Sequence, residues 1–374
     1  MKSKQSSNHA RVYHAPDYIL MGLIFGLLGF GLLALSSASV VVGIDRFGDS
    51  YVFLKRQLIQ GVLPGLMCGF VCYIVDYRFW KKWARFCLFG SLILLIAVLV
   101  SHLRVEAKGA QRWLDLGIFS FQPSEIAKLL FILYMASWLE KRKEYIRENW
   151  KMLWLFLMNL GVIAGLIFLQ PDLGTAGVVV LIGFAMYIGI GAPWQHLAVI
   201  VAGCSAVLYT AVKMAPYRLN RVLVFLHPGT DPQGIGYQIK QALIGIGSGG
   251  IIGLGFGRSR QKYNFLPEVT GDSIFAVIAE ELGFIVAFAV ICAFTLLVFR
   301  GLKIARNTRD QYGYLVALGL TVWIGFQAII NIGAIVSILP LTGVPLPFIS
   351  YGSTALVSNL MAMGILLNIS RQTK

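Results

Sequence analysis

Charged residues are scarce in this sequence. Asp, Glu, Lys and Arg make up 13% of the 374 residues and 57% are hydrophobic, whereas a soluble domain is about 25% charged. Acidic residues are the scarcest, with 17 Asp and Glu against 32 Lys and Arg. A soluble enzyme is therefore excluded. The positive charges lie between the apolar runs, so their excess does not predict nucleic-acid binding.

Familiar catalytic and metal-binding signatures are also missing. The sequence has no HExxH, no GxxxxGK[ST] and no Ser or Cys in a recognisable nucleophile elbow, which argues against the enzyme classes that those motifs mark. Its five cysteines lie inside apolar segments without metal-ligand spacing. We expect them to be free thiols rather than a disulfide framework.

Long apolar runs dominate the chain, whose mean hydropathy is +0.74. About 20 helical residues cross a bilayer core, and ten runs approach that length. We predict spans at Tyr18–Ser36, Gln57–Val75, Phe86–Ser101, Glu125–Leu139, Leu153–Leu169, Gly174–Ile190, His196–Met214, Ser273–Phe299, Gly313–Ile338 and Ser353–Ile369. The fold class is thus an all-α polytopic membrane protein. The first run is too long for a signal-peptide core, so we interpret it as a retained helix.

The distribution of Lys and Arg predicts the orientation. One set of short loops and tails carries eighteen Lys and Arg, and the opposing short loops carry six. By the positive-inside rule, both termini are cytoplasmic. No repeat of fixed period and no tandem soluble domain is evident, so residues 1–374 are expected to form one membrane domain.

One long connection, about residues 215–272, lies on the predicted outer side. Long connections in compact proteins are usually functional or disordered. This one is basic, with cations at Lys213, Arg218, Arg221, Lys240, Arg258, Arg260 and Lys262. Such a surface suits an anionic substrate at the outer face; the alternative is attraction to anionic lipid headgroups.

Ionisable residues within spans need partners or a cavity. Ser124 is a candidate N-cap, and Glu125 and Lys128 are spaced to form an i,i+3 pair. Glu280 and Glu281 lie on different faces of the eighth span, about 12 Å beyond its start, so we expect them not to share a partner. Lys128 is the best candidate partner for one of them.

Asp272 is the strongest candidate for acid–base chemistry. At the outer end of the eighth span it could act as a general base facing the cationic connection, or it could simply cap the helix. Asp172, before the sixth span, could likewise simply cap its helix. Residues 339–353 contain three prolines within eight residues, so they predict irregular backbone entering the membrane, tolerated only where protein or a cavity surrounds it.

Nine motifs occur in an order that resembles the SEDS family of bacterial FtsW, RodA and SpoVE proteins. They are KRQ (55–57), GAQRWLDLG (109–117), FQPSEIAK (121–128), QPDLGTA (170–176), YRLNRVLVFLHP (217–228), DPQGIGYQ (231–238), QKYNFLPE (261–268), GDSIFAVIAEELG (271–283) and LPLTGVPLPFISYGS (339–353). Each motif alone is weak, but together on ten spans they are specific. The run from Gly257 to Lys262 favours the FtsW-like branch.

The resemblance implies a peptidoglycan glycosyltransferase of the bacterial cytoplasmic (inner) membrane that polymerises lipid II. It also implies a class B penicillin-binding protein as partner, together with other divisome or elongasome membrane proteins. Asp272 matches the family's essential aspartate. The residues that fall on motif positions and are expected to bind substrate are Arg56, Arg112, Lys128, Arg218, Arg221, Lys262 and Glu268. Those expected to support them are Glu125, Asp172, Glu280, Glu281 and Ser350.

The sequence departs from the family pattern at two places. The usual His-Thr-Asp-Phe reads Thr270-Gly271-Asp272-Ser273, and the usual Tyr-Gly-Gly-Ser reads Tyr351-Gly352-Ser353-Thr354. The first departure affects the acceptor contacts beside the base rather than the base itself.

The expected mechanism is a direct, inverting displacement. Asp272 takes the proton of the acceptor's sugar 4-hydroxyl, and outer-side arginines with Lys128 stabilise the departing lipid pyrophosphate. A divalent cation, Mg or Mn, could share that task, although no ligand cluster demands one. Two other functions remain open: a flippase or transporter for lipid-linked precursors, and a non-catalytic divisome scaffold. The spans' cytoplasmic halves carry little charge, which disfavours a flippase.

Overall fold

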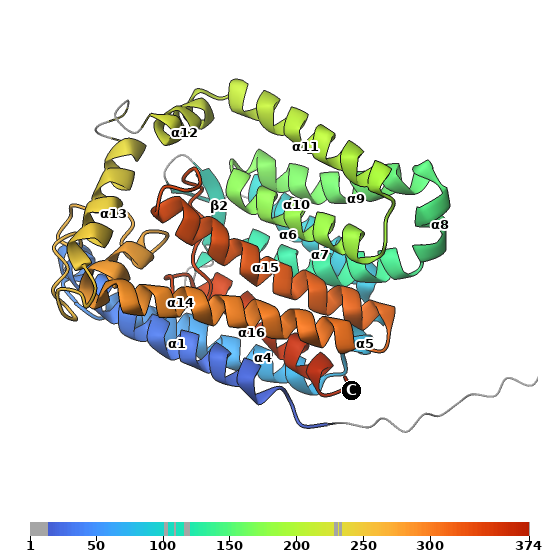
Figure 1. Ribbon diagram of the computed structural model, residues 1–374, viewed down its shortest axis with the longest axis horizontal. Coiled ribbons are helices and arrows are strands. Elements are labelled where there is room, and N and C mark those ends of the chain that lie inside the picture. The colour runs from blue at the N-terminus through green and yellow to red at the C-terminus, as the bar shows by residue number, and fades with distance from the viewer. Residues whose placement is uncertain are drawn as a thin grey trace, which may run out of the picture.

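The computed structural model describes residues 14–100, 104–107, 110–115, 120–227, 231 and 234–373, and these form a bundle of helices (Figure 1). The helices are α1 (Tyr18–Ala38), α2 (Val40–Phe47), α3 (Val52–Arg56), the π-helical turn η1 (Gln57–Val62), α4 (Leu63–Ile74), α5 (Tyr77–Lys82), α6 (Ala84–Val100), α7 (Pro123–Glu140), α8 (Lys143–Glu148), α9 (Trp150–Leu169), α10 (Leu173–Gly189), α11 (Trp194–Lys213), α12 (Pro216–Leu226), α13 (Ile235–Gly249), α14 (Ile274–Asn307), α15 (Gln311–Ile335) and α16 (Ser353–Ser370). The predicted all-α membrane fold is confirmed.

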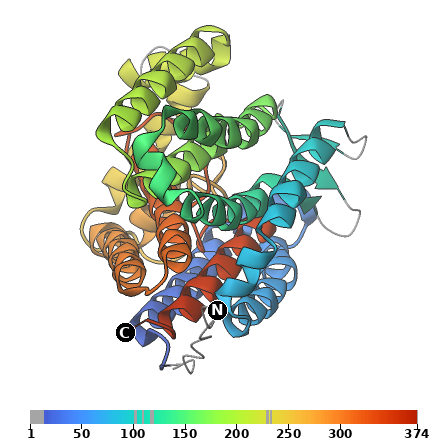
Figure 2. The same cartoon turned by 90° about the vertical axis from the view of Figure 1, so that its right-hand side faces the viewer.

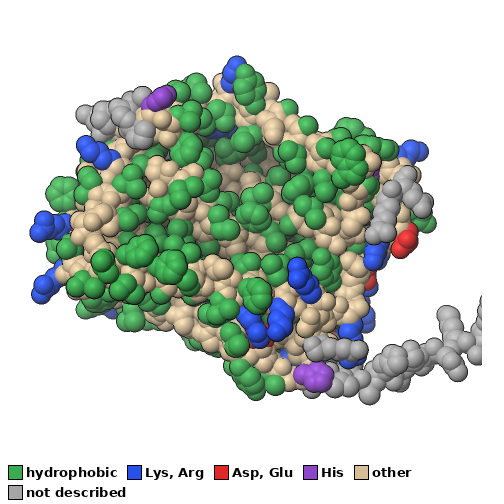
Figure 3. Space-filling view, in the orientation of Figure 1, with side chains coloured by type: hydrophobic (Ala, Val, Ile, Leu, Met, Phe, Trp, Pro, Cys, Tyr) green, Lys and Arg blue, Asp and Glu red, His purple; other side chains and the backbone are tan. Residues whose placement is uncertain are grey.

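Each of the ten predicted spans falls on a helix. Within the described residues, seven helical segments are long and apolar enough to cross a membrane, among them Val52–Ile74, which joins α3, η1 and α4. The shorter helices α6 and α10 are also apolar, and α7 covers the predicted fourth span. Hydrophobic side chains cover much of the face seen in Figure 3, as expected for a surface against lipid.

Of the seven long apolar segments, α15 and α16 are the most enclosed. Helix α16 packs closely against α4, where small residues let the two backbones meet. A Cβ atom built on Gly69 would lie 2.8 Å from the carbonyl oxygen of Leu360, and one on Gly364 would collide with the backbone of Gly69. By contrast α11 is little buried and lies at the edge of the bundle in Figure 1.

A small antiparallel sheet precedes α7, in a region where the sequence analysis expected only a loop. Its strands are β1 (Arg104–Ala107), β2 (Ala110–Asp115) and β3 (Ser120–Phe121), in the order β1-β2-β3. The short strand β2 carries Arg112 opposite the residues before α10. Alternation over so few residues gives a weak strand signal, which explains why the sheet was missed.

The long connection also contains more structure than expected. Helix α12 begins at Pro216, a residue suited to the first turn because its missing N–H has no helical partner. Helix α13 follows, and a series of turns then leads to α14. These elements lie together at one end of the bundle (Figure 1).

Helix α14 is longer than predicted and is broken inside. Gly283 has φ 78°, a left-handed conformation that glycine adopts without steric cost. The turns after α13 supply the backbone bonds that the break removes. The N–H of Leu254 donates to the carbonyl of Glu280 at 3.0 Å, and the N–H of Phe284 donates to the carbonyl of Gly250 at 2.9 Å. The long connection is therefore fastened to the spanning helix backbone to backbone.

The first and last described segments lie at the same end of the bundle. The backbone N–H of His14 donates to the carbonyl of Arg371 at 2.8 Å, and Figure 2 shows the start of α1 beside the end of α16. An even number of membrane crossings requires the two ends to lie on the same side of the membrane.

Candidate active site

Asp272 lies at the start of α14, half-buried, two residues before the first helical residue. The N-cap position belongs to Ser273, whose side chain makes no capping bond. The Ser273 hydroxyl instead accepts a hydrogen bond from the Gln238 amide of α13 at 3.0 Å. The interpretation of Asp272 as the N-cap is therefore wrong.

The backbone on both sides of Asp272 is held by buried polar side chains. The Asn331 amide of α15 donates to the Asp272 carbonyl at 2.9 Å, and the Ser350 hydroxyl donates to the Gly271 carbonyl at 2.6 Å. One residue earlier, the carbonyl of Thr270 accepts from the backbone N–H of Tyr351 at 2.8 Å. The carboxylate is thus carried on a segment with little freedom, and the predicted supporting role of Ser350 agrees with its position.

Residues 339–353 are irregular, and much of the segment is buried in protein, as the prolines predicted. Two amides of α15 satisfy its carbonyls: Gln327 donates to Pro345 at 3.0 Å, and Asn331 donates to Val344 at 2.8 Å. In this segment Gly343 has φ 72°, and a Cβ built there would lie 3.7 Å from the Asp272 carboxylate. The segment therefore forms one wall beside Asp272.

Arg112 and Asp172 come together from different parts of the chain. Asp172 caps α10, since its carboxylate accepts from the N–H and the hydroxyl of Thr175 at 3.1 and 2.9 Å. The same carboxylate lies 3.7 Å from the Arg112 guanidinium, which also donates to the carbonyl of Pro171. Asp172 is thus the predicted cap of α10, and it also pairs with a cation from β2.

Arg221 joins α12 to this site. Its guanidinium donates to the carbonyl of Leu341 at 3.1 Å. Burial lowers the pKa of the Arg221 guanidinium from its ordinary value, and the positive charge of Arg112 lowers it further. The negative charges of Asp272 and Asp172 act in the opposite sense. Arg112, Asp172 and Asp272 thus all lie within electrostatic reach of Arg221.

We call Arg112, Asp172, Arg221 and Asp272 the outer polar cluster. Buried polar atoms around it find no hydrogen-bond partner among the described residues, namely Nε of Arg112, Nε of Arg221, Oδ1 of Asn331 and Oγ1 of Thr342. Buried polar groups are rarely left without partners, because desolvation without a hydrogen bond is costly. This clustering of unsatisfied atoms is typical of a site prepared for a polar ligand.

Glu125 and Lys128 form the predicted i,i+3 ion pair. Their charged atoms lie 2.8 Å apart, and each side chain is only 1% exposed. The Lys128 ammonium also donates to Gln327 at 3.1 Å and lies over the ring of Trp323. Ser124 is not the N-cap, because α7 begins at Pro123. Lys128 therefore faces protein partners on α15.

The partners of Glu280 and Glu281 differ from those expected. Glu281 pairs with Lys262 at 2.9 Å, each side chain 3% exposed, so the assignment of Lys128 was wrong. Both glutamates also contact one residue: the Ser259 hydroxyl donates to Glu280 and its N–H to Glu281. The expectation that they share no partner was wrong as well. Ser259 contacts both glutamates because it offers two donors, a hydroxyl and a backbone N–H.

Three other predicted substrate contacts lie outside the outer polar cluster. Arg56 lies over the ring of Phe47 at 4.7 Å. Arg218 is buried and donates to the carbonyl of Ala211 at 3.1 Å. Glu268 is exposed, with φ 56°, in the turn before Asp272. Of the seven predicted substrate-binding residues, Arg221 lies within electrostatic reach of Asp272, and Arg112 lies within reach of Arg221 and pairs with Asp172.

Sequence reasoning missed Gln327 and Asn331. Both are buried on α15, four residues apart and thus on one helical face, and both hold residues 339–353. Two amides one turn apart in an apolar span were the available signal, because polar side chains in such helices are costly unless they have partners.

The family model for the cell cycle proteins FtsW, RodA and SpoVE matches residues 18–374. The chain belongs to this family. It is 38% identical to stage V sporulation protein E of Bacillus subtilis, covering 96% of this chain and 98% of that protein. It is 39% identical to a probable peptidoglycan glycosyltransferase FtsW of Trichlorobacter lovleyi, covering 96% and 94%.

Solved structures agree with the sequence relatives. A chain of a peptidoglycan synthase complex that coordinates polymerization and crosslinking is 30% identical, with a TM-score of 0.79 over 96% of this chain and 98% of that one. The rod shape determining protein RodA of Thermus thermophilus is 28% identical, with a TM-score of 0.71 over 96% and 98%. The resemblance, with its preference for the FtsW-like branch, is confirmed. The chain is a multi-pass membrane enzyme, a peptidoglycan glycosyltransferase.

Proposed function

We propose that this enzyme polymerises lipid II at the outer face of the bacterial cytoplasmic membrane, with Asp272 as the general base. The observation that carries the proposal is the outer polar cluster. It places a half-buried carboxylate within electrostatic reach of Arg221, which in turn lies within reach of Arg112. A base and an anion-binding site are the two elements that this transfer needs.

Asp272 would take the proton from the sugar 4-hydroxyl of the acceptor, whose oxygen then attacks the anomeric carbon of the donor. The bond to the lipid pyrophosphate breaks on the opposite face, so the anomeric centre inverts. The pyrophosphate leaves as an anion and needs no acid. Arg112 and Arg221 stabilise the negative charge that develops on it.

Lys128 supports this reaction indirectly. Its ammonium holds Gln327, whose amide in turn holds the carbonyl of Pro345. The Glu125–Lys128 pair therefore fixes α7 and α15 beneath the wall that faces Asp272. Lys262 has a comparable role, because its pair with Glu281 fixes the end of the long connection to α14.

The Mg or Mn ion considered from sequence finds no ready-made ligand set. Among the described residues, no three His, Cys, Asp or Glu side chains lie close enough together to hold a metal. We therefore derive no step through a metal. A dependence of the reaction on a divalent cation stays a prediction.

We also propose that the enzyme works with a class B penicillin-binding protein in cell division. The support is the likeness to a chain of a complex that couples polymerization to crosslinking, together with relatives named FtsW. Polymerisation and crosslinking act on the same strand, so a paired transpeptidase is the expected partner. Other divisome or elongasome membrane proteins would join through it.

Polymerisation of labelled lipid II tests the base. The full chain is purified with its penicillin-binding partner, whose own polymerising activity is absent, and wild type is compared with Asp272→Asn. The variant keeps the shape and removes the base, so we expect no polymer. The matched control is Asp45→Asn, because the Asp45 carboxylate accepts an exposed hydrogen bond from the Asn264 amide and lies outside the outer polar cluster. The control should polymerise like wild type.

Equal polymer from wild type and Asp272→Asn would show that the base lies elsewhere. No polymer from either, with the partner bound, would favour the scaffold. A flippase would instead move labelled lipid II across vesicle membranes without extending it. Melting temperature and partner binding are measured for each variant, so that loss of fold is separated from loss of chemistry.

A further inference from the structure

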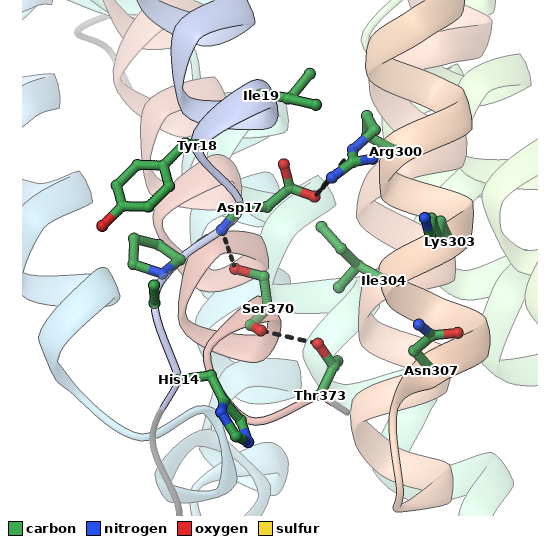
Figure 4. A pocket seen from close by; sticks show the side chains of 12 residues that line it. His14, Asp17, Tyr18, Ile19, Arg300, Lys303, Ile304, Asn307, Ser370 and Thr373 are labelled. Atoms are coloured by element: carbon green, nitrogen blue, oxygen red, sulfur yellow. Dashed lines mark hydrogen bonds and ion pairs between the residues drawn. The ribbon is translucent and has the colours of Figure 1, made fainter.

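A second polar site lies at the opposite end of the bundle, far along α14 from Asp272. It is a cavity of about 430 Å³ between the start of α1, the last turns of α14 and the end of α16 (Figure 4). The first and last described segments of the chain meet here, on the side predicted to be cytoplasmic. The reaction proposed above does not use this cavity.

The cavity wall is positively charged. Arg300 and Lys303, three residues apart on α14, both line it. Among the described residues that line it, Asp17 is the one acid, and it is already engaged: one carboxylate oxygen accepts from Leu20 N–H at 3.0 Å, and the other accepts from Arg300 at 2.6 Å. Lys303 is exposed and makes no hydrogen bond or ion pair with any described residue. Within the described residues the Lys303 ammonium therefore has no carboxylate counterion.

The cavity opens beside an apolar surface. Ile19 of α1 lines it and is 51% exposed, and Phe299, next to Arg300, is 63% exposed. Tyr18, also in the wall, is an amphipathic residue of the kind enriched at the membrane–water interface. A bound molecule would thus have a polar part among the cations and an apolar part along α1 and α14.

We propose that this cavity binds the phosphate headgroup of an anionic glycerophospholipid from the leaflet at this end of the bundle. Lys303 and Arg300 contact the phosphate, and the acyl chains lie along Ile19 and Phe299. Basic pockets between spanning helices on the cytoplasmic side bind anionic lipid headgroups. The apolar flank favours a lipid over free phosphate as the ligand.

Native mass spectrometry of the full chain tests the site. Purified protein in detergent is titrated with phosphatidylglycerol and with phosphatidylcholine of the same acyl chains. We expect wild type to retain phosphatidylglycerol preferentially, and Lys303→Gln to bind it about fivefold more weakly, the effect of one Lys near an anionic lipid. Lys303→Arg should restore binding. The matched control is Arg306→Gln, since Arg306 is an exposed cation on the same helix that does not line the cavity.

The possible outcomes separate the sources of binding. If Lys303→Gln and Arg306→Gln lose phosphatidylglycerol binding equally, or if neither loses it, the cavity is not the binding site. The lipid would then be held by diffuse attraction to the charged end of the helix. Competition by free glycerol phosphate at the concentration of the lipid would overturn the lipid as ligand and leave a phosphate site. Because Lys303 has no described partner, its substitution should not change the melting temperature without lipid, and this measurement confirms that the variant is folded.

Discussion

The deeply buried charges of the Glu125–Lys128 and Lys262–Glu281 pairs are stable in the membrane because each has a specific partner. Glu125 and Lys128 are almost fully buried and satisfy each other. Such a pair adds little stability compared with an apolar pair, but removing one partner leaves an uncompensated buried charge. The contribution of the pair to stability is therefore seen only when one of its two residues is replaced.

Glu125→Gln should destabilise the protein by about 3–5 kcal/mol, the cost of leaving a buried cation unpaired. We expect a lower melting temperature in detergent, measured by the intrinsic fluorescence of the purified chain. The double variant Glu125→Gln/Lys128→Met should recover most of the loss, because it removes both charges.

The control for this prediction is the exposed pair of Lys55 and Asp49, whose charged atoms lie 2.7 Å apart. Solvent screens exposed pairs, which contribute little, so Lys55→Gln should leave the melting temperature unchanged. A comparable fall in melting temperature in Glu125→Gln and Lys55→Gln would mean that burial does not make the Glu125–Lys128 pair more important for stability than an exposed pair.

At the scale of the element, α14 is two helical segments joined at Gly283. The break is stabilised by backbone bonds from the turns after α13, and several glycines in those turns also have positive φ. An irregular backbone at this depth is tolerated because protein covers it. The break places Asp272 and the long connection on a segment separate from the rest of α14.

Gly283→Ala should weaken this junction. An L-residue is strained at φ 78°, and its Cβ would collide with the backbone of Gly253 and Ile251. We expect a lower melting temperature and faster proteolysis of the chain between α13 and α14, followed by limited digestion and mass spectrometry.

Gly161→Ala is the matched control. Gly161 lies inside α9, and a Cβ there would meet no atom within 4 Å. Alanine in such a helical position is favoured over glycine by about 0.5–1 kcal/mol, so the variant should be as stable as wild type or slightly more stable. A fall as large as that of Gly283→Ala would contradict a specific role for the break.

At the scale of the whole molecule, the outer polar cluster exists only because distant segments meet. Arg112 comes from β2, Asp172 precedes α10, Arg221 lies on α12 and Asp272 precedes α14. Residues 339–353 lie between them, and α15 holds that segment. Every part of the bundle therefore contributes to the position of the site.

Arg221→Gln should reduce lipid II polymerisation roughly 100-fold or more, the usual loss when one group that stabilises transition-state charge is removed. Binding to the penicillin-binding partner should be retained. The measurement is the initial rate of polymer formation under saturating substrate, with the melting temperature as a test of folding.

Lys213→Gln is the control for charge alone. Lys213 is near the same side of the membrane, but it lies over the ring of Tyr209 at the end of α11, outside the cluster. Its rate should match that of wild type. If both variants lose activity equally, the basic charge of the outer surface matters and the geometry of the cluster does not.

The sequence by itself determined the features that depend on neighbouring residues. Apolar runs identified ten helices, because crossing a membrane requires a continuous apolar segment of fixed length. Prolines identified the irregular segment 339–353, and local spacing identified the Asp172 cap and the Glu125–Lys128 pair. Each of these follows from backbone or side-chain geometry within a few residues.

The tertiary structure alone decided which distant charges meet. It paired Lys262 with Glu281 and turned Lys128 toward α15. It also placed Arg221 within electrostatic reach of both Asp272 and Arg112, while Arg218 packed elsewhere. The physical reason is that burying a charge demands a partner but does not specify one. Which partner is within reach depends on how the helices pack.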